Sequence, residues 1–544
     1  MSITPLEELR ASVEAVAAEL RDGKPAPQVR PTLERPPRPD FGDYSTNAAM
    51  LLAPALGAPP RQIAERLAGA LTGRLGSRVD RVEVAGPGFL NVFLAEEWFV
   101  SALADVLAAG EDYGSGAPER PERVLVEFVS ANPTGPLTAA SGRHAAYGDA
   151  LARTLELAGH AVEREYYFND SGSQVRKLGE SIQARARGSE VPEDGYQGEY
   201  VTALAAAIPS AADADVDELA HRGVELVMAG IRATLEAFRV HYDSWFLERT
   251  LYEGAPSPLE VAYARLEEHG HVYRSEGALW MRTSALGDDK DRVLQRSSGE
   301  PTYFARDVAY HADKLERGFD RLINPLGADH HGYVARMRAA MAALGAEPDR
   351  LEIPILQFVH IVEGSRRASM SKRRGDFITL DDLIAEIGVD AARFFMLQRS
   401  HDSTVDLDLD LAREQSNENP VYYVQYAHAR IASVLAKAGE ARTAEALAAP
   451  VRPGGLEVAE RELIKKLLAF PAEVAEAAER RAPHRIAVYA LELAQAFTAF
   501  YRDCHVVGAE PAAVESFRIG LCVAAQRVIA RSLDLLGVAA PESM

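Results

Sequence analysis

Residues 124–151 combine, in direct succession, an apolar run, a turn rich in proline and glycine, and an alanine-rich helical stretch. The run at 124–129 has the continuous hydrophobicity that is typical of a parallel strand buried on both faces. A helix that begins after such a turn presents free backbone N–H groups and the positive end of its dipole, both of which attract anions. The segment therefore predicts an α/β domain that binds a phosphate-bearing ligand at the turn.

A second motif lies far downstream, where residues 369–375 read Ser-Met-Ser-Lys-Arg-Arg-Gly. It places Ser371 beside Lys372 in a cationic loop, and an ammonium group can stabilise the charge on departing pyrophosphate. Together the two motifs resemble the paired signatures of class I aminoacyl-tRNA synthetases. The words Ser-Ala-Asn-Pro-Thr-Gly-Pro-Leu at 130–137 resemble the arginyl-tRNA synthetase version. That resemblance implies a Rossmann-type catalytic domain with ATP contacts at Pro133, Gly135, Ala140, Gly142, Met370 and Lys372.

Both signatures depart from the family pattern. The family's His-x-Gly-His is replaced by Thr138-Ala139-Ala140-Ser141, and the first lysine of Lys-Met-Ser-Lys-Arg is replaced by Ser369. Thr138 and Ser141 keep the three-residue spacing, so both hydroxyls fall on one face of the helix start. We expect Thr138, Ser141, Ser371 and Lys372 to be the catalytic side chains. The alternative is that Thr138 only caps the helix and Ser141 only packs.

The pocket for the amino acid needs carboxylates, because a guanidinium has five donors and no acceptor. Tyr303 and Asp307 are one helical turn apart, so both can face one cavity, and Glu127 is a charged residue at the end of a buried strand. The resemblance implies contacts to the α-amino end of arginine from Glu127 and Asn132, and to its side chain from Tyr303 and Asp307. An ion pair with Arg306 or Lys314 is the alternative for Asp307.

Residues 324–333 read Asn-Pro-Leu-Gly-Ala-Asp-His-His-Gly-Tyr and connect a strand to a helix. Adjacent histidines beside an aspartate suggest a metal site, but consecutive side chains point in different directions and no further ligands follow at regular spacing. We therefore expect no protein-bound metal here. The resemblance instead places Asp329 and His330 in the cleft for adenosine and arginine.

Turn-rich and proline-rich segments divide the chain into three predicted domains. A small α+β domain at 1–115 precedes a catalytic domain at 116–410, which contains a helical insertion at about 178–275, and an all-α bundle follows at 411–544. The resemblance implies tRNA contacts from Phe89 and Asn91 in the first domain and from Tyr426 and Arg430 in the last. Exposed aromatic rings can stack on unpaired bases, although each of these aromatic residues could equally belong to a core.

Composition limits the class of protein. The chain has 544 residues, a formal charge of −21 and two cysteines, Cys504 and Cys522. Two thiols are too few for a disulfide framework or a four-thiolate zinc site, and no window approaches about 20 apolar residues. We expect a cytoplasmic monomer that acts without a membrane.

The preferred interpretation is an arginine–tRNA ligase whose substrates are L-arginine, ATP with Mg²⁺, and tRNA for arginine. Two alternatives remain. The first is a synthetase paralogue that binds tRNA or arginine but has lost useful activation together with both histidines. The second is an unrelated nucleotidyl-transferring enzyme on the same fold, since a fold does not specify a function.

Overall fold

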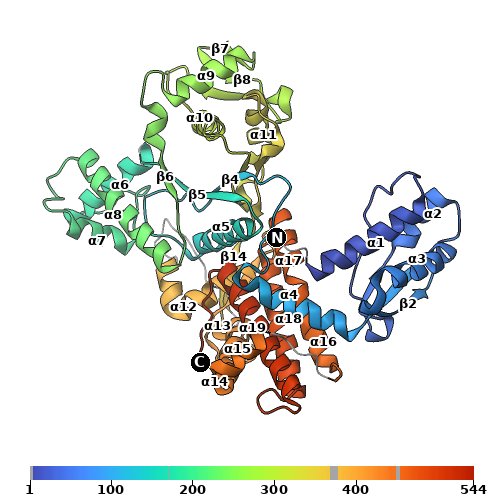
Figure 1. Ribbon diagram of the computed structural model, residues 1–544. Helices are drawn as coiled ribbons and strands as arrows, with labels where there is room; N and C mark the ends of the chain where they lie inside the picture. Colours follow the sequence, from blue (N-terminus) through green and yellow to red (C-terminus); the bar gives the residue numbers. More distant parts are fainter. Residues whose placement is uncertain (1–3, 171, 365, 368–377, 449–453) are drawn as a thin grey trace.

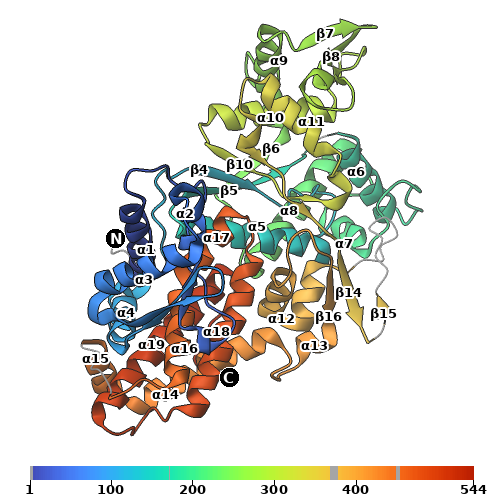
Figure 2. The same ribbon diagram turned by 90° about the vertical axis from the view of Figure 1, so that its right-hand side faces the viewer.

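The computed structural model of the chain describes residues 4–170, 172–364, 366–367, 378–448 and 454–544. Helices and strands alternate around a central parallel sheet, and the small N-terminal region and the C-terminal helical bundle lie next to each other (Figures 1 and 2). This arrangement confirms the predicted fold class, an α/β catalytic region between a small α+β region and an all-α region.

The N-terminal region packs four helices against a short antiparallel sheet of order β1-β3-β2. Thr4 begins the first helix with a capping box that includes Glu7. The elements are α1 (Pro5–Arg21), β1 (Tyr44–Thr46), α2 (Ala48–Leu56), α3 (Pro60–Leu75), β2 (Val79–Ala85), β3 (Phe89–Leu94) and α4 (Glu96–Ala109).

The central sheet has five parallel strands in the order β12-β10-β4-β5-β6. Val124, Leu125 and Val126 of β4 are inaccessible to solvent, as expected for a strand with neighbours on both sides and helices on both faces. The strands are β4 (Arg123–Glu127), β5 (Ala161–Phe168), β6 (Ser244–Leu247), β10 (Arg321–Ile323) and β12 (Leu351–Glu352). Helix α5 (Ala139–Leu157) connects β4 to β5.

The connection between β5 and β6 is a unit of three helices, α6 (Ser173–Ala186), α7 (Glu199–Ala207) and α8 (Val216–Ala237). We expected a helical insertion at about 178–275, and this range also contains two short strands, β6 and β7 (Val272–Ser275). Both strands have only four residues, and such a short run carries too little period-two alternation to distinguish it from helix in a sequence.

The chain then forms α9 (Pro258–Glu268) and an antiparallel sheet of order β7-β8-β9, before it returns to the central sheet through α10. Smaller sheets pair β11 with β13 and place β14 between β15 and β16. The elements are β8 (Ala278–Met281), β9 (Arg292–Gln295), α10 (Tyr303–Glu316), β11 (Leu326–Gly327), α11 (Tyr333–Ala343), β13 (Ile355–Leu356), β14 (Val359–Glu363), β15 (Arg366–Arg367), α12 (Leu380–Leu397), β16 (Val405–Asp408) and α13 (Leu409–Arg413).

Six helices are described in the C-terminal region, within residues 420–448 and 454–544. The chain turns at Ala469, because Pro471 lies in the first turn of a new helix, where its missing N–H is tolerated. The helices are α14 (Pro420–Ala438), α15 (Glu440–Ala448), α16 (Val458–Leu468), α17 (Phe470–Glu479), α18 (His484–Asp503) and α19 (Ala512–Leu535).

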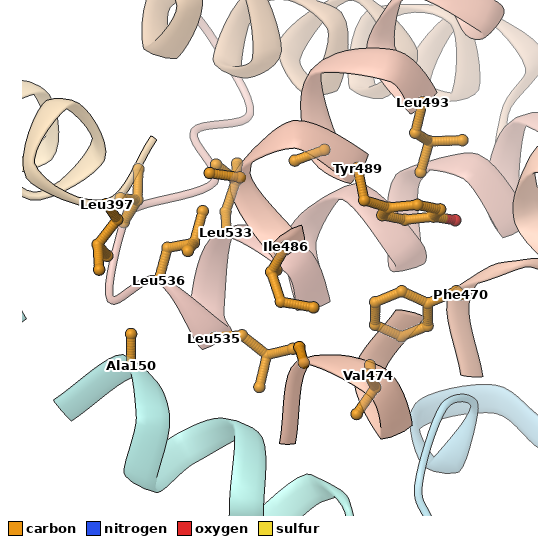
Figure 3. Close-up of a cluster of buried hydrophobic side chains, with 14 of the residues drawn as sticks. Ala150, Leu397, Phe470, Val474, Ile486, Tyr489, Leu493, Leu533, Leu535 and Leu536 are labelled. Carbon is orange, nitrogen blue, oxygen red and sulfur yellow. The ribbon is translucent and has the colours of Figure 1, made fainter. Parts of the chain in front are cut away.

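A shared hydrophobic core joins this bundle to the central region. Figure 3 shows Ala150 of α5 and Leu397 of α12 beside Leu533 and Leu535 of α19, and all four are buried. The guanidinium of Arg393 is buried in the same region, where it donates to Leu536 O at 2.8 Å and to Asp149 of α5. The helix that begins at the predicted phosphate site is therefore held from behind by the C-terminal bundle.

Candidate active site

The turn after β4 has a strained backbone. Val129 and Ser130 have φ of 67° and 40°, in the left-handed region that β-branched residues avoid. The strained turn directs the Ser130 hydroxyl to Glu127 Oε1 at 3.0 Å, and Ser130 Oγ accepts from Tyr167 N at 3.1 Å. Strain of this kind costs roughly 1–3 kcal/mol and is concentrated at functional sites. The turn is thus held in one shape by bonds to both neighbouring strands.

Thr138 caps α5. Its Oγ1 accepts from Ser141 N at 3.3 Å and lies 3.1 Å from Ser141 Oγ. The two predicted catalytic hydroxyls therefore share one face of the helix, as expected, and they also bond to each other. Since only one of the two hydrogens is used between them, one hydroxyl hydrogen is left for a ligand. Thr138 therefore caps the helix, as the alternative expected. The cap does not conflict with a catalytic role, which stays a prediction.

His144, the imidazole nearest to these hydroxyls in the sequence, is no cationic substitute for the missing histidines. Burial, together with the adjacent guanidinium of Arg143, lowers its pKa to about 4. The ring is therefore neutral at pH 7. Arg143 is itself buried and donates to Gln357 O at 2.6 Å and to Ser403 O at 2.8 Å. These bonds tie the first turns of α5 to two loops of the second half.

The flank of the second signature lies against the start of α5. Ala139 N donates to Ile378 O at 3.0 Å, Leu380 N donates to Leu137 O at 2.9 Å, and Thr138 pairs with Thr379 in an isolated antiparallel bridge. Ser369, Met370, Ser371 and Lys372 lie outside the described residues, so their predicted roles stay predictions. Their downstream neighbours are nevertheless bonded directly to the predicted phosphate-binding helix.

The predicted ATP contacts divide into buried and accessible positions. Pro133 and Gly135 are buried in the turn, and Gly142 is buried so closely that a Cβ there would lie 2.8 Å from Leu380 Cδ1. Ala140 is exposed, and its N–H has no partner among the residues that the structure describes. Ala140 is thus the backbone donor best placed for an anion, whereas Gly142 allows close packing of α5 against α12.

Glu127 is held by three side chains. Its Oε2 accepts from Lys314 Nζ at 2.5 Å and from Asn324 Nδ2 at 3.0 Å, and its Oε1 accepts from Ser130. Lys314 is completely buried. The buried ammonium of Lys314 therefore neutralises the charge of Glu127. The three bonds fix the orientation of the Glu127 carboxylate at the carboxyl end of β4 without a ligand.

Asp307 lies near Glu127 and accepts a hydrogen bond from the hydroxyl of Tyr333. The pKa of Asp307 is raised to about 7, mainly by burial and also by the negative charges of Glu127 and Glu248, while the bond from Tyr333 opposes the rise. The ion pairs considered for Asp307 form elsewhere, because Arg306 pairs with Glu248 and Lys314 pairs with Glu127. A buried, half-protonated carboxylate at pH 7 can be ionised fully by a cationic ligand.

The other predicted arginine contacts are more open. Tyr303 is 62% exposed and its ring stacks on Arg306, with the guanidinium carbon 4.9 Å from the ring centroid. Asn132 is exposed and donates to Gln174 Oε1 at 2.9 Å. Asp329 and His330 pair with each other at 3.4 Å and line a cavity of about 730 Å³ together with Tyr333. Tyr333 thus connects this cavity to Asp307.

Sequence reasoning assigned no site role to Glu248, Asn324 and Tyr333, and it considered Lys314 only as a partner of Asp307. Glu248 is 2% exposed, accepts from Tyr167 OH at 2.8 Å, and follows β6 directly. Glu127 and Asn324 stand at the same end of β4 and β10. Residues after the carboxyl ends of parallel strands converge on one crevice, so a search for polar residues at each strand end would have found Glu248 and Asn324.

The predicted tRNA contacts differ in accessibility. Phe89 is 39% exposed, but Asn91 is 6% exposed on β3, the central strand of its sheet. Tyr426 is 37% exposed, and Arg430 stacks on it and on Tyr501, with its guanidinium carbon 5.0 and 5.1 Å from the two ring centroids. Phe89 and the group formed by Tyr426, Arg430 and Tyr501 are therefore available to a ligand, whereas the amide of Asn91 is enclosed.

Within the described residues, no group of three or more His, Cys, Asp or Glu side chains is arranged to hold a metal ion. Among the helices in the described part of the chain, none is both long and apolar enough to cross a membrane.

Three family models match the chain. Residues 7–94 match the arginyl tRNA synthetase N terminal domain, residues 212–432 the class I (R) tRNA synthetase catalytic domain, and residues 424–544 the DALR anticodon binding domain. The altered start of α5 lies outside the three matched segments.

Similar proteins include the arginine–tRNA ligases of Frankia alni, 45% identical over all of both chains, and of Bacillus subtilis, 43% identical over 99% of this chain and 98% of that one. The solved arginyl-tRNA synthetase of Thermus thermophilus superposes with a TM-score of 0.77 at 27% identity and covers 99% of both chains.

Proposed function

Because the chain belongs to the arginyl-tRNA synthetase family, we propose that it activates L-arginine with ATP and transfers the arginyl group to tRNA. The observation that carries this proposal is the acidic group formed by Glu127 and Glu248, at the carboxyl ends of β4 and β6, and Asp307 of α10. Glu127 and Glu248 are each paired with a cation of the protein. Asp307 is therefore the carboxylate that can pair with the guanidinium of the substrate.

In the proposed reaction, the arginine carboxylate attacks the α-phosphorus of ATP, supplied as its Mg²⁺ complex, and pyrophosphate leaves. A terminal ribose hydroxyl of the tRNA then takes the arginyl group from the adenylate. No side-chain nucleophile is needed, so the protein contributes positioning and charge stabilisation. We assign these tasks to Ala140 N–H, the hydroxyls of Thr138 and Ser141, and the ammonium of Lys372.

For tRNA, we propose that Phe89 and the group formed by Tyr426, Arg430 and Tyr501 stack on unpaired bases. We also propose that the protein works as a cytoplasmic monomer. One chain carries both the proposed activation site and the proposed tRNA contacts, so neither step requires a second copy.

The test is aminoacylation of tRNA transcripts for arginine with Mg-ATP and labelled arginine. We expect charging with arginine and none with lysine, whose ammonium lacks the planar donors of a guanidinium. If these transcripts remain uncharged while arginine binding is measurable, the chain is the activation-deficient paralogue. A synthetase of known activity, assayed in parallel, establishes that the transcripts can be charged.

A further inference from the structure

The three-helix unit α6–α8 contacts the turn before α5 from a part of the chain that neither signature includes. Tyr200 of α7 donates its hydroxyl to Thr134 O at 2.8 Å. Its ring lies 3.1 Å from the position that a Cβ on Gly135 would occupy, so an alanine there would crowd the ring. Burial raises the pKa of the Tyr200 hydroxyl, which therefore remains a neutral donor. Tyr200 thus holds both the backbone and one side of the turn.

The same unit contacts the flank of the second signature. In α8, Thr234 is 6% exposed, and its Oγ1 lies 2.9 Å from Asp381 Oδ2 in the first turn of α12. The residues that begin α12 are bonded in turn to the start of α5, through the bridge between Thr138 and Thr379. One packed unit therefore reaches both polypeptide segments that enclose the proposed phosphate site.

We propose that Tyr200 is a positioning residue for ATP, acting through the 133–135 turn, with Thr234 as a weaker second support. The inference rests on the proposed function, which assigns ATP to this turn. The strained residues Val129 and Ser130 precede the turn, and such a backbone persists only when its surroundings over-determine it. The Tyr200 hydroxyl restrains the residues that follow, through Thr134 O, and a displaced turn would misdirect the N–H of Ala140.

The experiment compares Tyr200→Phe with Tyr489→Phe. Each change removes a hydroxyl that donates to a backbone carbonyl at 2.8 Å, to Thr134 in the first case and to Lys466 in the second. Tyr489 lies in the C-terminal core (Figure 3), away from the proposed site. Titration calorimetry with a non-hydrolysable ATP analogue measures nucleotide binding directly, and titration with arginine serves as the internal reference.

We expect the analogue to bind about tenfold more weakly to Tyr200→Phe and equally well to Tyr489→Phe, while the Kd for arginine changes less than twofold in both. In aminoacylation, the KM for ATP should rise with the Kd. Unchanged analogue binding in Tyr200→Phe, or an equal loss in the control, overturns the proposal. A parallel loss of arginine affinity also overturns it, because that pattern indicates general damage.

A second pair of changes keeps the proposal testable if Tyr200→Phe does not fold. Gly135→Ala crowds the same contact from the turn, and Thr234→Val removes the second support. We expect about tenfold weaker analogue binding in the first and a two- to threefold loss in the second, and native binding in both refutes the assignment. Since the titration requires no catalysis, wild-type protein that binds the analogue but charges no tRNA would refute the ligase proposal and leave this one standing.

Discussion

The two halves of the proposed site differ in where their charges come from. At the arginine half, Glu127 and Glu248 are bonded to buried or half-buried cations of the protein, and Asp307 is left with a tyrosine hydroxyl. At the phosphate half, the described groups are neutral: the Thr138 and Ser141 hydroxyls, the Ala140 N–H and a neutral His144. Amino-acid recognition is therefore preorganised by fixed charge, whereas phosphate stabilisation depends on dipoles and on the cationic loop.

Both departures from the family pattern, in the His-x-Gly-His and the Lys-Met-Ser-Lys-Arg signatures, fall in the phosphate half. At the proposed arginine half, the residues that the resemblance implies are all present in the chain. At the phosphate half, Thr138, Ser141 and Ser369 stand where the family pattern has two histidines and a lysine. The comparison predicts that substitutions in the arginine half act mainly on binding, and substitutions in the phosphate half mainly on the rate of activation.

The largest effect is expected for Asp307→Ala. It removes the carboxylate that is proposed to pair with the substrate guanidinium. Arginine binding should weaken by about 2–5 kcal/mol, roughly 30-fold to several-thousand-fold. Titration with arginine measures the change. Asp313→Ala is the matched control, since it removes a carboxylate from the same helix that is paired with Arg317 at 3.0 Å. Equal affinities for the variant and the wild type would exclude Asp307 from the pocket.

Next in size is Lys372→Ala. Because the hydroxyls of Thr138 and Ser141 and the N–H of Ala140 are neutral, the ammonium of Lys372 should stabilise most of the negative charge of the transition state. Its loss should slow adenylate formation about 100-fold. Arginine affinity should remain at the wild-type value. Single-turnover formation of adenylate measures the rate, and near-native turnover would show that the loop is not catalytic.

A smaller effect is expected from pH. The guanidinium binds the ionised form of Asp307, whose pKa is raised to about 7 by burial. The ionised fraction falls from about 0.9 at pH 8 to about 0.1 at pH 6, so arginine should bind about tenfold more weakly at pH 6. In Asp307→Asn this dependence should disappear while the remaining weak binding persists. A pH-independent Kd for the wild-type protein would contradict the raised pKa.

The smallest effect concerns the helix start. Thr138→Val removes a capping acceptor and should lower the free energy of unfolding by about 1 kcal/mol, measured by urea denaturation. Ser141→Ala leaves the cap in place and should change stability by a few tenths of a kcal/mol. For both variants the activation rate should fall about tenfold or less. A 100-fold loss in Ser141→Ala would transfer the main catalytic role from Lys372 to the hydroxyls.

The sequence alone determined those features that depend on local pattern. The apolar run of β4 and the proline–glycine turn predicted a buried parallel strand followed by a phosphate-binding helix, because backbone geometry relates these elements over a few residues. Prolines likewise mark the starts of α14, α18 and α19, at Pro420, Pro483 and Pro511. The sequence motifs predicted Glu127, Asn132, Tyr303 and Asp307 as arginine-binding residues, and these roles stay predictions.

Only the tertiary structure decided which charges meet. Lys314 reaches Glu127 across 187 positions of the sequence, and Tyr200 reaches Thr134 across 66. No local pattern encodes such pairs, since they depend on how the strands order themselves in the sheet and on how the insertion packs against it. The same holds for Asp307, because its pKa depends on burial and on two distant carboxylates. The sequence specifies which titratable side chains are present, and their packing determines their partners and protonation.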